Sequence, residues 1–220
     1  ATISAVPILQ AVLFDMDGTL VETESLWHEA EVLTMTSFGS SWSDEEQRSA
    51  LGGPFDRVVE YMATKVAVDA ADVGTKLVQS IDELMRSRPL PVQPGVRELH
   101  EEVCAAGIPT GLVTNSFRQL IELVLESTGL QFDVTVAGDE LTENKPHPMP
   151  YQVACQRLGV DPAGVAVLED SMTGIASATS AGCFVVAIPH LALIDSADRQ
   201  LIVPSAADVN LATLRELVAD

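Results

Sequence analysis

Hydrophobic and polar positions change their spacing along the chain, and this change separates two kinds of region. From about residue 21 to 89, apolar residues recur at helical spacing, and no segment has the pattern of a strand. After residue 95, short apolar runs such as 109–114 and 164–168 alternate with helical segments that end at glycine. Alternating strands and helices predict a parallel, doubly wound sheet.

The pattern also predicts the bounds of the individual elements. The apolar faces of three helices in the first region are marked by Leu26, Trp27, Ala30, Leu33 and Phe38, then by Val58, Val59, Tyr61 and Met62, then by Val73, Leu77, Ile81, Leu84 and Met85. A further helix there begins at the capping box Ser43–Glu46 and stops at 52–54, Gly-Gly-Pro. The second region predicts helices 96–106, 117–128, 149–158, 173–181 and 211–218 and strands 109–114, 133–137, 164–168 and 183–188.

One more strand, 11–15, precedes the helical region, which therefore interrupts a single α/β unit. We expect residues 1–20 and 90–220 to form an α/β core and residues 21–89 to form an inserted helical cap. The proline-rich segment 89–95 is the expected return linker and hinge. A free-standing helical bundle fused to another domain is the alternative, which the preceding strand disfavours.

Composition limits the classes of partner. The 220 residues, 47% of them hydrophobic, suffice for one substantial core and a small accessory domain. The net charge of −20 disfavours nucleic acid and anionic membranes. No apolar run approaches the length of a membrane span. We therefore expect a soluble, cytoplasmic monomer that binds a small molecule, with Cys104, Cys155 and Cys183 as reduced thiols in the core.

The first strand leads into two carboxylates, Asp15 and Asp17, at the edge where open α/β sheets bind ligands. Their side chains point broadly the same way and repel by roughly 4 kcal/mol at 4 Å and an effective dielectric of 20. A hard divalent cation would relieve this repulsion. An Asp-Gly turn would explain Gly18 and only one of the acids. A calcium loop is disfavoured because Leu20 occupies its glycine position.

Three later segments carry further chemistry at expected strand ends. Thr114 and Asn115 precede a helix, where a hydroxyl and backbone N–H groups can bind an anion, or where Thr114 can simply cap that helix. Lys145 lies in a proline-stiffened loop, although a lone lysine is usually a solvated charge. Glu169 and Asp170 can cap a helix or complete an oxygen-rich site of the kind that Mg²⁺ prefers.

These residues resemble the motifs of a known family. The segment 14–19, Phe-Asp-Met-Asp-Gly-Thr, resembles the first motif of the haloacid dehalogenase superfamily. Thr114, Lys145 and the pair Glu169-Asp170 resemble its three later motifs, in the same order along nearly the whole chain. The resemblance implies a Rossmann-like core, a small helical cap inserted after the first strand, and Mg²⁺ as the cofactor.

The resemblance also implies roles for the residues. Asp15 would attack phosphorus and form an aspartyl-phosphate, and Asp17 would act as the general acid and base. Thr114 and the backbone of Asn115 would bind the phosphoryl group, and Lys145 would neutralise charge.

The implied metal site comprises Asp15, Asp17 through its backbone carbonyl, and the later acidic pair. Asp170 would ligate Mg²⁺ directly, and Glu169 would either ligate it or support a ligand.

The cap carries a weaker resemblance that concerns the substrate. The segment 22–27 resembles the corresponding segment of phosphatases that act on 2-deoxyglucose 6-phosphate and related hexose or hexitol phosphates. The turn at Gly53 and the following Arg57 resemble a cap loop that faces the site in that branch. Trp27, Gly53 and Arg57 are therefore candidate substrate contacts, with packing inside the cap as the alternative for Trp27.

The expected function is hydrolysis of a small phosphomonoester, in particular a sugar phosphate. Asp17 disfavours dehalogenation and phosphonate hydrolysis, which do not require an acid at that position. One alternative is β-phosphoglucomutase, which shares the four motifs. By resemblance, that enzyme has a cap histidine at the position where this chain has Trp27. Another alternative is a protein that retains the fold without catalysis, which the intact motifs disfavour.

Overall fold

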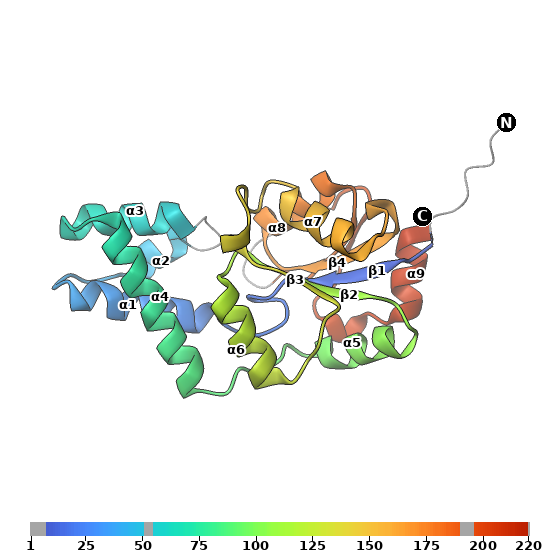
Figure 1. Cartoon of the computed structure of the whole chain (residues 1–220), viewed down its shortest axis with the longest axis horizontal. Coiled ribbons are helices and arrows are strands. Elements are labelled where there is room, and N and C mark those ends of the chain that lie inside the picture. Colours follow the sequence, from blue (N-terminus) through green and yellow to red (C-terminus); the bar gives the residue numbers. More distant parts are fainter. Residues whose placement is uncertain (1–7, 51–54, 190–195, 220) are drawn as a thin grey trace.

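A parallel sheet forms the centre of the core and determines where its loops lie (Figure 1). The computed structural model describes residues 8–50, 55–189 and 196–219. Within these residues the sheet has six strands in the order β3-β2-β1-β4-β5-β6, and every neighbouring pair is parallel. The strands are β1 Ala11–Phe14, β2 Thr110–Val113, β3 Val134–Val136, β4 Val165–Glu169, β5 Phe184–Ala187 and β6 Gln200–Ile202.

The central strand β1 is buried on both faces, which explains why its sequence reads as a continuous apolar run. Val12 and Phe14 contribute to one hydrophobic cluster, and Ala11 and Leu13 contribute to the other. Figure 1 shows α7 and α8 on one face of the sheet and α5, α6 and α9 on the opposite side. These helices are α5 Val96–Ala105, α6 Arg118–Thr128, α7 Met149–Leu158, α8 Met172–Ala181 and α9 Leu211–Ala219.

Among the described residues, four helices lie between β1 and α5 and extend beyond one end of the sheet (Figure 1). They are α1 Glu24–Ser37, α2 Asp44–Ala50, α3 Phe55–Val66 and α4 Ala70–Ser87. The capping box of α2 forms as predicted, because Ser43 N–H donates to Glu46 Oε2 at 2.8 Å and Glu46 N–H donates to Ser43 Oγ at 3.3 Å. Leu33 and Tyr61, predicted on buried faces, are instead 46% and 47% exposed. The predicted stop at 52–54 lies outside the described residues.

The two segments that connect these helices to the sheet are bonded to each other. Gln93 N–H donates to the carbonyl of Leu20 at 2.9 Å, and Glu22 N–H donates to that of Pro91 at 3.1 Å. Val21 forms an antiparallel bridge with the second segment. The chain therefore leaves and re-enters the core as one paired ribbon, which is a suitable hinge.

The predicted fold class is confirmed, and the predicted strands and helices of the core lie within a few residues of the observed ones. The strand β6 was not predicted. The prediction that all three cysteines are core thiols is wrong for Cys104, which is exposed, whereas Cys155 and Cys183 are buried. Cys104 follows Val103, the last buried residue of α5, and is turned from it by about 100°. Among the described residues, no helix combines the length and hydrophobicity needed to cross a bilayer.

Candidate active site

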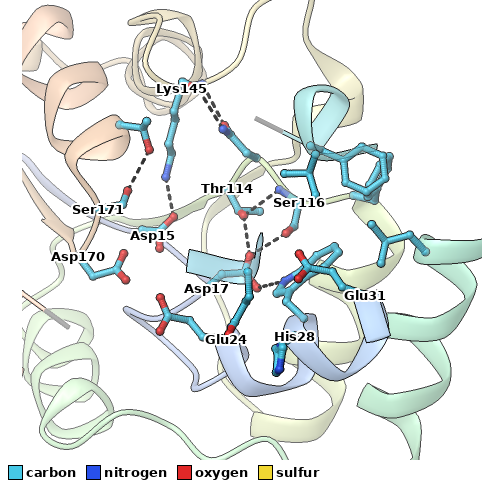
Figure 2. A pocket seen from close by; sticks show the side chains of 18 residues that line it. Asp15, Asp17, Glu24, His28, Glu31, Thr114, Ser116, Lys145, Asp170 and Ser171 are labelled. Atoms are coloured by element: carbon cyan, nitrogen blue, oxygen red, sulfur yellow. Dashed lines mark hydrogen bonds and ion pairs between the residues drawn. The ribbon is translucent and has the colours of Figure 1, made fainter. Parts of the chain in front are cut away.

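Parallel pairing brings the acidic residues together at one edge of the sheet. Asp15 directly follows β1, Glu169 ends β4, and these two strands are neighbours, so their carboxyl ends meet. A cavity opens above them between the sheet edge and the helices α1 to α4. Figure 2 shows Lys145, Thr114 and Asp17 around it, with Glu24, His28 and Glu31 contributed by α1.

Lys145 is buried at the floor of this cavity and is held by two carboxylates. Its Nζ donates to Asp15 Oδ1 and to Glu169 Oε1, each at 2.6 Å, and to the carbonyl of Val113 at 2.9 Å. Burial opposes the charged form, but the charges of Asp15 and Glu169 outweigh it and hold the pKa of Lys145 above its ordinary value. The lysine is therefore a permanent cation beside Asp15.

The loop that carries Lys145 is fixed by the side chain of Asn115. The amide of Asn115 donates to the carbonyl of Lys145 at 3.1 Å and accepts from its N–H at 2.9 Å. The sequence had suggested only a backbone contribution from Asn115, because its side-chain partner lies 30 residues away. The reciprocal pair of hydrogen bonds explains how a loop residue reaches a fixed position in the site.

Glu169 has both carboxylate oxygens occupied by protein donors. Oε1 accepts from Lys145 and, at 2.7 Å, from the hydroxyl of Tyr151. Oε2 accepts from the N–H groups of Asp170 and Ser171 at 3.2 and 3.3 Å and from the Ser171 hydroxyl at 3.1 Å. Such a carboxylate has little capacity left for a further ligand. Its arrangement is that of a support for Lys145.

Asp170 shares the site with fewer partners. Its Oδ1 accepts from the Thr19 hydroxyl at 3.3 Å. A Cβ at Gly18 would lie 2.2 Å from Asp170 Oδ2, so only glycine allows the first loop to pass this close to the carboxylate. Asp170 therefore faces the loop that also carries Asp15 and Asp17.

The buried carboxylates carry more negative charge than Lys145 can balance. Oxygen atoms of Asp15, Glu169 and Asp170 lie within 4.8 Å of one another. Burial and then the charge of Glu169 raise the pKa of Asp15 to about 8. Burial and then the charge of Asp15 raise the pKa of Asp170 to about 9. A compact cluster of oxygen ligands that resists ionisation fits a hard cation such as Mg²⁺, which would stabilise the charged forms.

The Asp17 side chain points away from this cluster and bridges the sheet edge and the first cap helix. Oδ1 accepts from the Thr23 hydroxyl at 2.6 Å and from the Trp27 indole N–H at 3.2 Å. Oδ2 accepts from the hydroxyls of Ser116 at 2.7 Å and Thr114 at 3.1 Å. Figure 2 shows Thr114 and Ser116 beside this carboxylate. The hydrogen bonds of Asp17 therefore depend on the position of α1 relative to the sheet.

Aromatic contacts close the cavity beside Asp17. The ring of Trp27 packs edge-on against Phe55 of α3, with ring centroids 6.4 Å apart. Phe55 in turn packs edge-on against Phe117, before α6, at 4.9 Å. Trp27 thus both packs within the cap, as the alternative interpretation held, and faces the cavity.

The structure brings most of the predicted site residues together. The following line the cavity: Asp15, Asp17, Trp27, Thr114, Asn115, Lys145 and Asp170. Arg57, a candidate substrate contact, is exposed and lines a separate hollow with Ser43 and Tyr61. Phe55 faces the cavity, and Arg57 is rotated from it by about 200° on α3, which explains the difference. Gly53 lies outside the described residues.

Among the residues of the site that were not predicted from the sequence are three that hold its carboxylates. Thr23 and Ser116 hold Asp17, and Tyr151 holds Glu169. The position of Ser116, directly after Thr114 and Asn115, was a usable signal. Tyr151 gave no signal in the sequence, because its burial, which makes its hydroxyl require a hydrogen-bond partner, is seen only in the structure. Thr23 gave none, because a threonine before a helix is ordinarily read as a cap.

A Rossmann-like sheet with an inserted helical cap, and a buried Asp–Lys pair beneath the cavity between them, define a capped α/β enzyme. The chain belongs to the haloacid dehalogenase-like hydrolase family, whose model matches residues 12–188. The resemblance found in the sequence motifs is thereby confirmed.

Relatives and solved structures place the chain more closely. Hexitol phosphatase B of Escherichia coli K12 is 32% identical over 216 residues, which cover 95% of this chain and 94% of that protein. A mutant of CbbY from Rhodobacter sphaeroides, solved in complex with xylulose 1,5-bisphosphate, matches with a TM-score of 0.83 and 29% identity and covers 94% of this chain and 99% of its own. β-Phosphoglucomutase from Clostridium difficile, with a TM-score of 0.83 and 22% identity over 96% of this chain and 97% of its own, shares the fold.

Proposed function

We propose that the protein is a magnesium-dependent phosphomonoester hydrolase that acts on a small sugar phosphate through an aspartyl-phosphate on Asp15. The family and the similarity to a protein named hexitol phosphatase B identify the chain as a phosphatase. The observation that carries the rest is the buried pair of Asp15 and Lys145 beneath a cavity that Asp17 also lines. A nucleophile, a fixed cation and an acid/base group are thereby available in one site.

The cluster of carboxylates supports a Mg²⁺ site. Asp15 and Asp170 would hold the ion through side-chain oxygens, and Asp17 through its backbone carbonyl. Glu169 would support Lys145 instead of ligating the metal, because its oxygens are occupied. When bound, Mg²⁺ would draw electron density from the phosphoryl oxygens and offset the repulsion between them and the carboxylates.

In the first step, a carboxylate oxygen of Asp15 attacks phosphorus in line and the bond to the leaving oxygen breaks. Lys145 lowers the repulsion between the attacking carboxylate and the phosphate. The hydroxyl of Thr114 and the backbone of Asn115 fix the phosphoryl group in orientation. Thr114 Oγ1 now donates to Asp17, so phosphate binding would redirect this hydroxyl.

Asp17 carries the proton for both half-reactions. It donates a proton to the leaving oxygen in the first step and accepts one from the attacking water in the second. Its carboxylate is now held by four side-chain donors of the described residues. Because Thr23 and Trp27 belong to the hinge and the first cap helix, movement of the cap would alter this hold and release Asp17 towards the leaving group. Closure of the cap would also exclude bulk water from the first step.

Hydrolysis is favoured over the mutase reaction by the cap. A mutase requires a second phosphate site, and among the described residues that line the cavity Lys145 is the only lysine or arginine. Phosphorus NMR on β-glucose 1-phosphate with a trace of the 1,6-bisphosphate separates the two reactions. We expect inorganic phosphate to accumulate. Faster accumulation of glucose 6-phosphate would contradict the proposal.

Catalysis itself is tested by release of phosphate from p-nitrophenyl phosphate. A protein that keeps the fold without catalysis would show no turnover at any metal concentration. The same assay does not depend on which sugar phosphate is the natural substrate.

We further propose that the enzyme works as a cytoplasmic monomer without nucleic acid or membrane partners. The net charge of −20 supports the absence of those partners. Cys155 and Cys183 are buried free thiols, which supports a reducing compartment. Size-exclusion chromatography with light scattering tests the oligomeric state.

A further inference from the structure

The cap side of the cavity presents a row of polar groups on α1. Glu24, His28 and Glu31 lie at a spacing of four and three residues, so they share one face of this helix, and all three line the cavity. Gln47 of α2 adds an amide to the same lining. This wall faces the part of a substrate that remains after the phosphoryl group has been bound at the sheet edge.

The charge of this wall is negative or neutral. Among the described lining residues Lys145 is the only lysine or arginine, and it is committed to Asp15 and Glu169. The segment 51–54 that precedes α3 has the sequence Leu-Gly-Gly-Pro and adds no charged side chain. His28 is thus the one other basic side chain among the described lining residues. It lies between two glutamates of α1, and its Nε2 is 3.8 Å from Asp44 Oδ1 of α2.

Glu31 has an oxygen available in the cavity. The residue is 8% exposed, and Oε2 accepts from the Trp42 indole N–H at 2.8 Å. In the described part of the chain no donor reaches Oε1. Because Glu31 lines the cavity, a carboxylate oxygen without a protein donor is a strong acceptor for a ligand hydroxyl there. One turn earlier on the same face, Nδ1 of His28 is also buried without a hydrogen-bond partner among the described residues.

We propose that Glu31, with His28, determines specificity by hydrogen-bonding a hydroxyl of the leaving group and by disfavouring a second phosphate or carboxylate. The preferred substrates would then be monophosphates of uncharged polyhydroxy compounds, such as sugars and sugar alcohols. This inference rests on the proposed phosphatase function and specifies which substrates that site admits. The relative CbbY, solved with a bisphosphate, shows that the shared fold can also hold a doubly anionic ligand.

Substrate profiles of three proteins test this inference. Wild type, Glu31→Gln and the matched control Glu29→Gln are compared on sorbitol 6-phosphate, glucose 6-phosphate, 2-phosphoglycolate, xylulose 1,5-bisphosphate and p-nitrophenyl phosphate at pH 8. Glu29 lies on the same helix, but its carboxylate is exposed and pairs with Arg88 at 2.7 Å. It does not line the cavity.

We expect wild type to prefer sorbitol 6-phosphate or glucose 6-phosphate, whose leaving groups are uncharged, over 2-phosphoglycolate and the bisphosphate, which carry a second anionic group. The difference in kcat/KM should be at least about tenfold, because the second anionic group meets like charge. Glu31→Gln should raise KM for the preferred sugar phosphate about tenfold and thereby reduce the difference in kcat/KM between the two groups of substrates. Turnover of p-nitrophenyl phosphate should stay within about twofold, because its leaving group has no hydroxyl donor. Glu29→Gln should keep the wild-type profile.

Three results would overturn the inference while leaving the phosphatase function intact. One is wild type that prefers 2-phosphoglycolate or the bisphosphate. Another is a Glu31→Gln variant that loses activity equally on the preferred sugar substrate and p-nitrophenyl phosphate, which would indicate a merely structural role. A third is a Glu31→Gln variant whose substrate profile is the same as that of wild type. If Glu31→Gln does not fold, the substrate profiles of His28→Asn and of wild type test the inference instead. A wild-type protein that cleaves no substrate, including p-nitrophenyl phosphate, would overturn the proposed function instead.

Discussion

The two walls of the cavity differ in how fully their polar groups are satisfied. On the sheet side, Lys145 makes three hydrogen bonds, and both oxygens of Glu169 have protein donors. On the cap side, Glu31 has one donor and Nδ1 of His28 has no partner in the described residues. The groups for chemistry are thus positioned before the substrate arrives. The groups for recognition await hydroxyls that the substrate brings.

This difference has an energetic meaning. A hydrogen bond to a charged group contributes roughly 1.5–3 kcal/mol, so a network such as that around Glu169 holds its members in a single arrangement. An unsatisfied buried acceptor lowers stability by a similar amount until a ligand donates to it. Substitutions on the sheet side should therefore alter turnover, and those on the cap side should alter selectivity.

Asp15→Asn should reduce phosphate release to below roughly a thousandth of the wild-type rate, because it removes the nucleophile. The amide has the same shape as the carboxylate and lowers the negative charge of the cluster, so the fold should persist. Release from p-nitrophenyl phosphate measures the rate, and circular dichroism with thermal unfolding provides the control. Residual activity above that level in a folded variant would contradict the assigned role.

Removal of metal should have the next largest effect. After exhaustive EDTA treatment we expect activity to fall at least about a hundredfold, because the carboxylates then repel the phosphate without compensation. Added Mg²⁺ should restore the rate. Ca²⁺ should restore little of it, because its coordination is larger and looser. Full activity of the metal-depleted enzyme would count against the metal site.

Tyr151→Phe should lower turnover about tenfold and stability by about 1.5–3 kcal/mol, because Glu169 loses a buried donor. The matched control is Tyr61→Phe, whose exposed hydroxyl donates to Glu46 at 3.2 Å. This control should change stability by less than about 0.5 kcal/mol and leave turnover unchanged. Urea unfolding and steady-state kinetics measure the two quantities. Equal effects of the two variants would show that the hydrogen bond from Tyr151 to Glu169 contributes no more to stability and turnover than an exposed one.

Trp27→Phe should lower kcat about threefold and leave KM unchanged, because Asp17 loses the weaker donor of its Oδ1 and keeps three others. Kinetics on glucose 6-phosphate separate positioning of Asp17 from a direct substrate contact. A raised KM with an unchanged kcat would support the direct contact that the sequence suggested.

Glu31→Gln should leave turnover of p-nitrophenyl phosphate unchanged but change how stability depends on pH. Burial raises the pKa of Glu31 to about 7, so the folded protein retains a proton that the unfolded chain releases near pH 4.5. Wild type therefore loses stability as pH rises from 4.5 to 7, and the glutamine variant lacks this loss. The variant should gain on the order of 2 kcal/mol relative to wild type between pH 5 and pH 8.

Urea unfolding at the two pH values measures this difference. Glu29→Gln, which replaces an exposed carboxylate, should show no such gain. A Glu31→Gln variant whose relative stability does not rise with pH would show that the carboxylate is not desolvated.

Much of the core followed from its sequence because buried parallel strands have a simple pattern. β1 and β4 are short apolar runs followed by acids, and their parallel neighbours share one functional edge. β6 was missed because its Gln200-Leu-Ile sequence is short, pairs with one neighbour only and resembles a loop. Leu33 was assigned to a buried face because helical spacing identifies a face without showing where its edge lies.

The site was predictable where several motifs occur in a fixed order along the chain. Asp15, Lys145 and Asp170 belong to such motifs, although Lys145 and Asp170 taken singly have other ordinary uses. Apart from Ser116, the partners of Asp17 and Glu169 were not predictable, because they depend on which helix packs beside the loop. Arg57 shows the converse, since its charge suggested a substrate contact and its place on α3 turned it to solvent.

The paired linkers have a consequence for how such proteins can be recombined. Because the N–H of Gln93 already reaches the carbonyl of Leu20, a short turn could join these residues and the sheet would still close. Residues 21–92 can therefore be regarded as a cassette, exchangeable by insertion at a single point without a new core. Thr23 and Trp27 limit that freedom, since both hold Asp17. A grafted cassette that omits these two donors would change the selectivity and would also hold the Asp17 carboxylate less firmly.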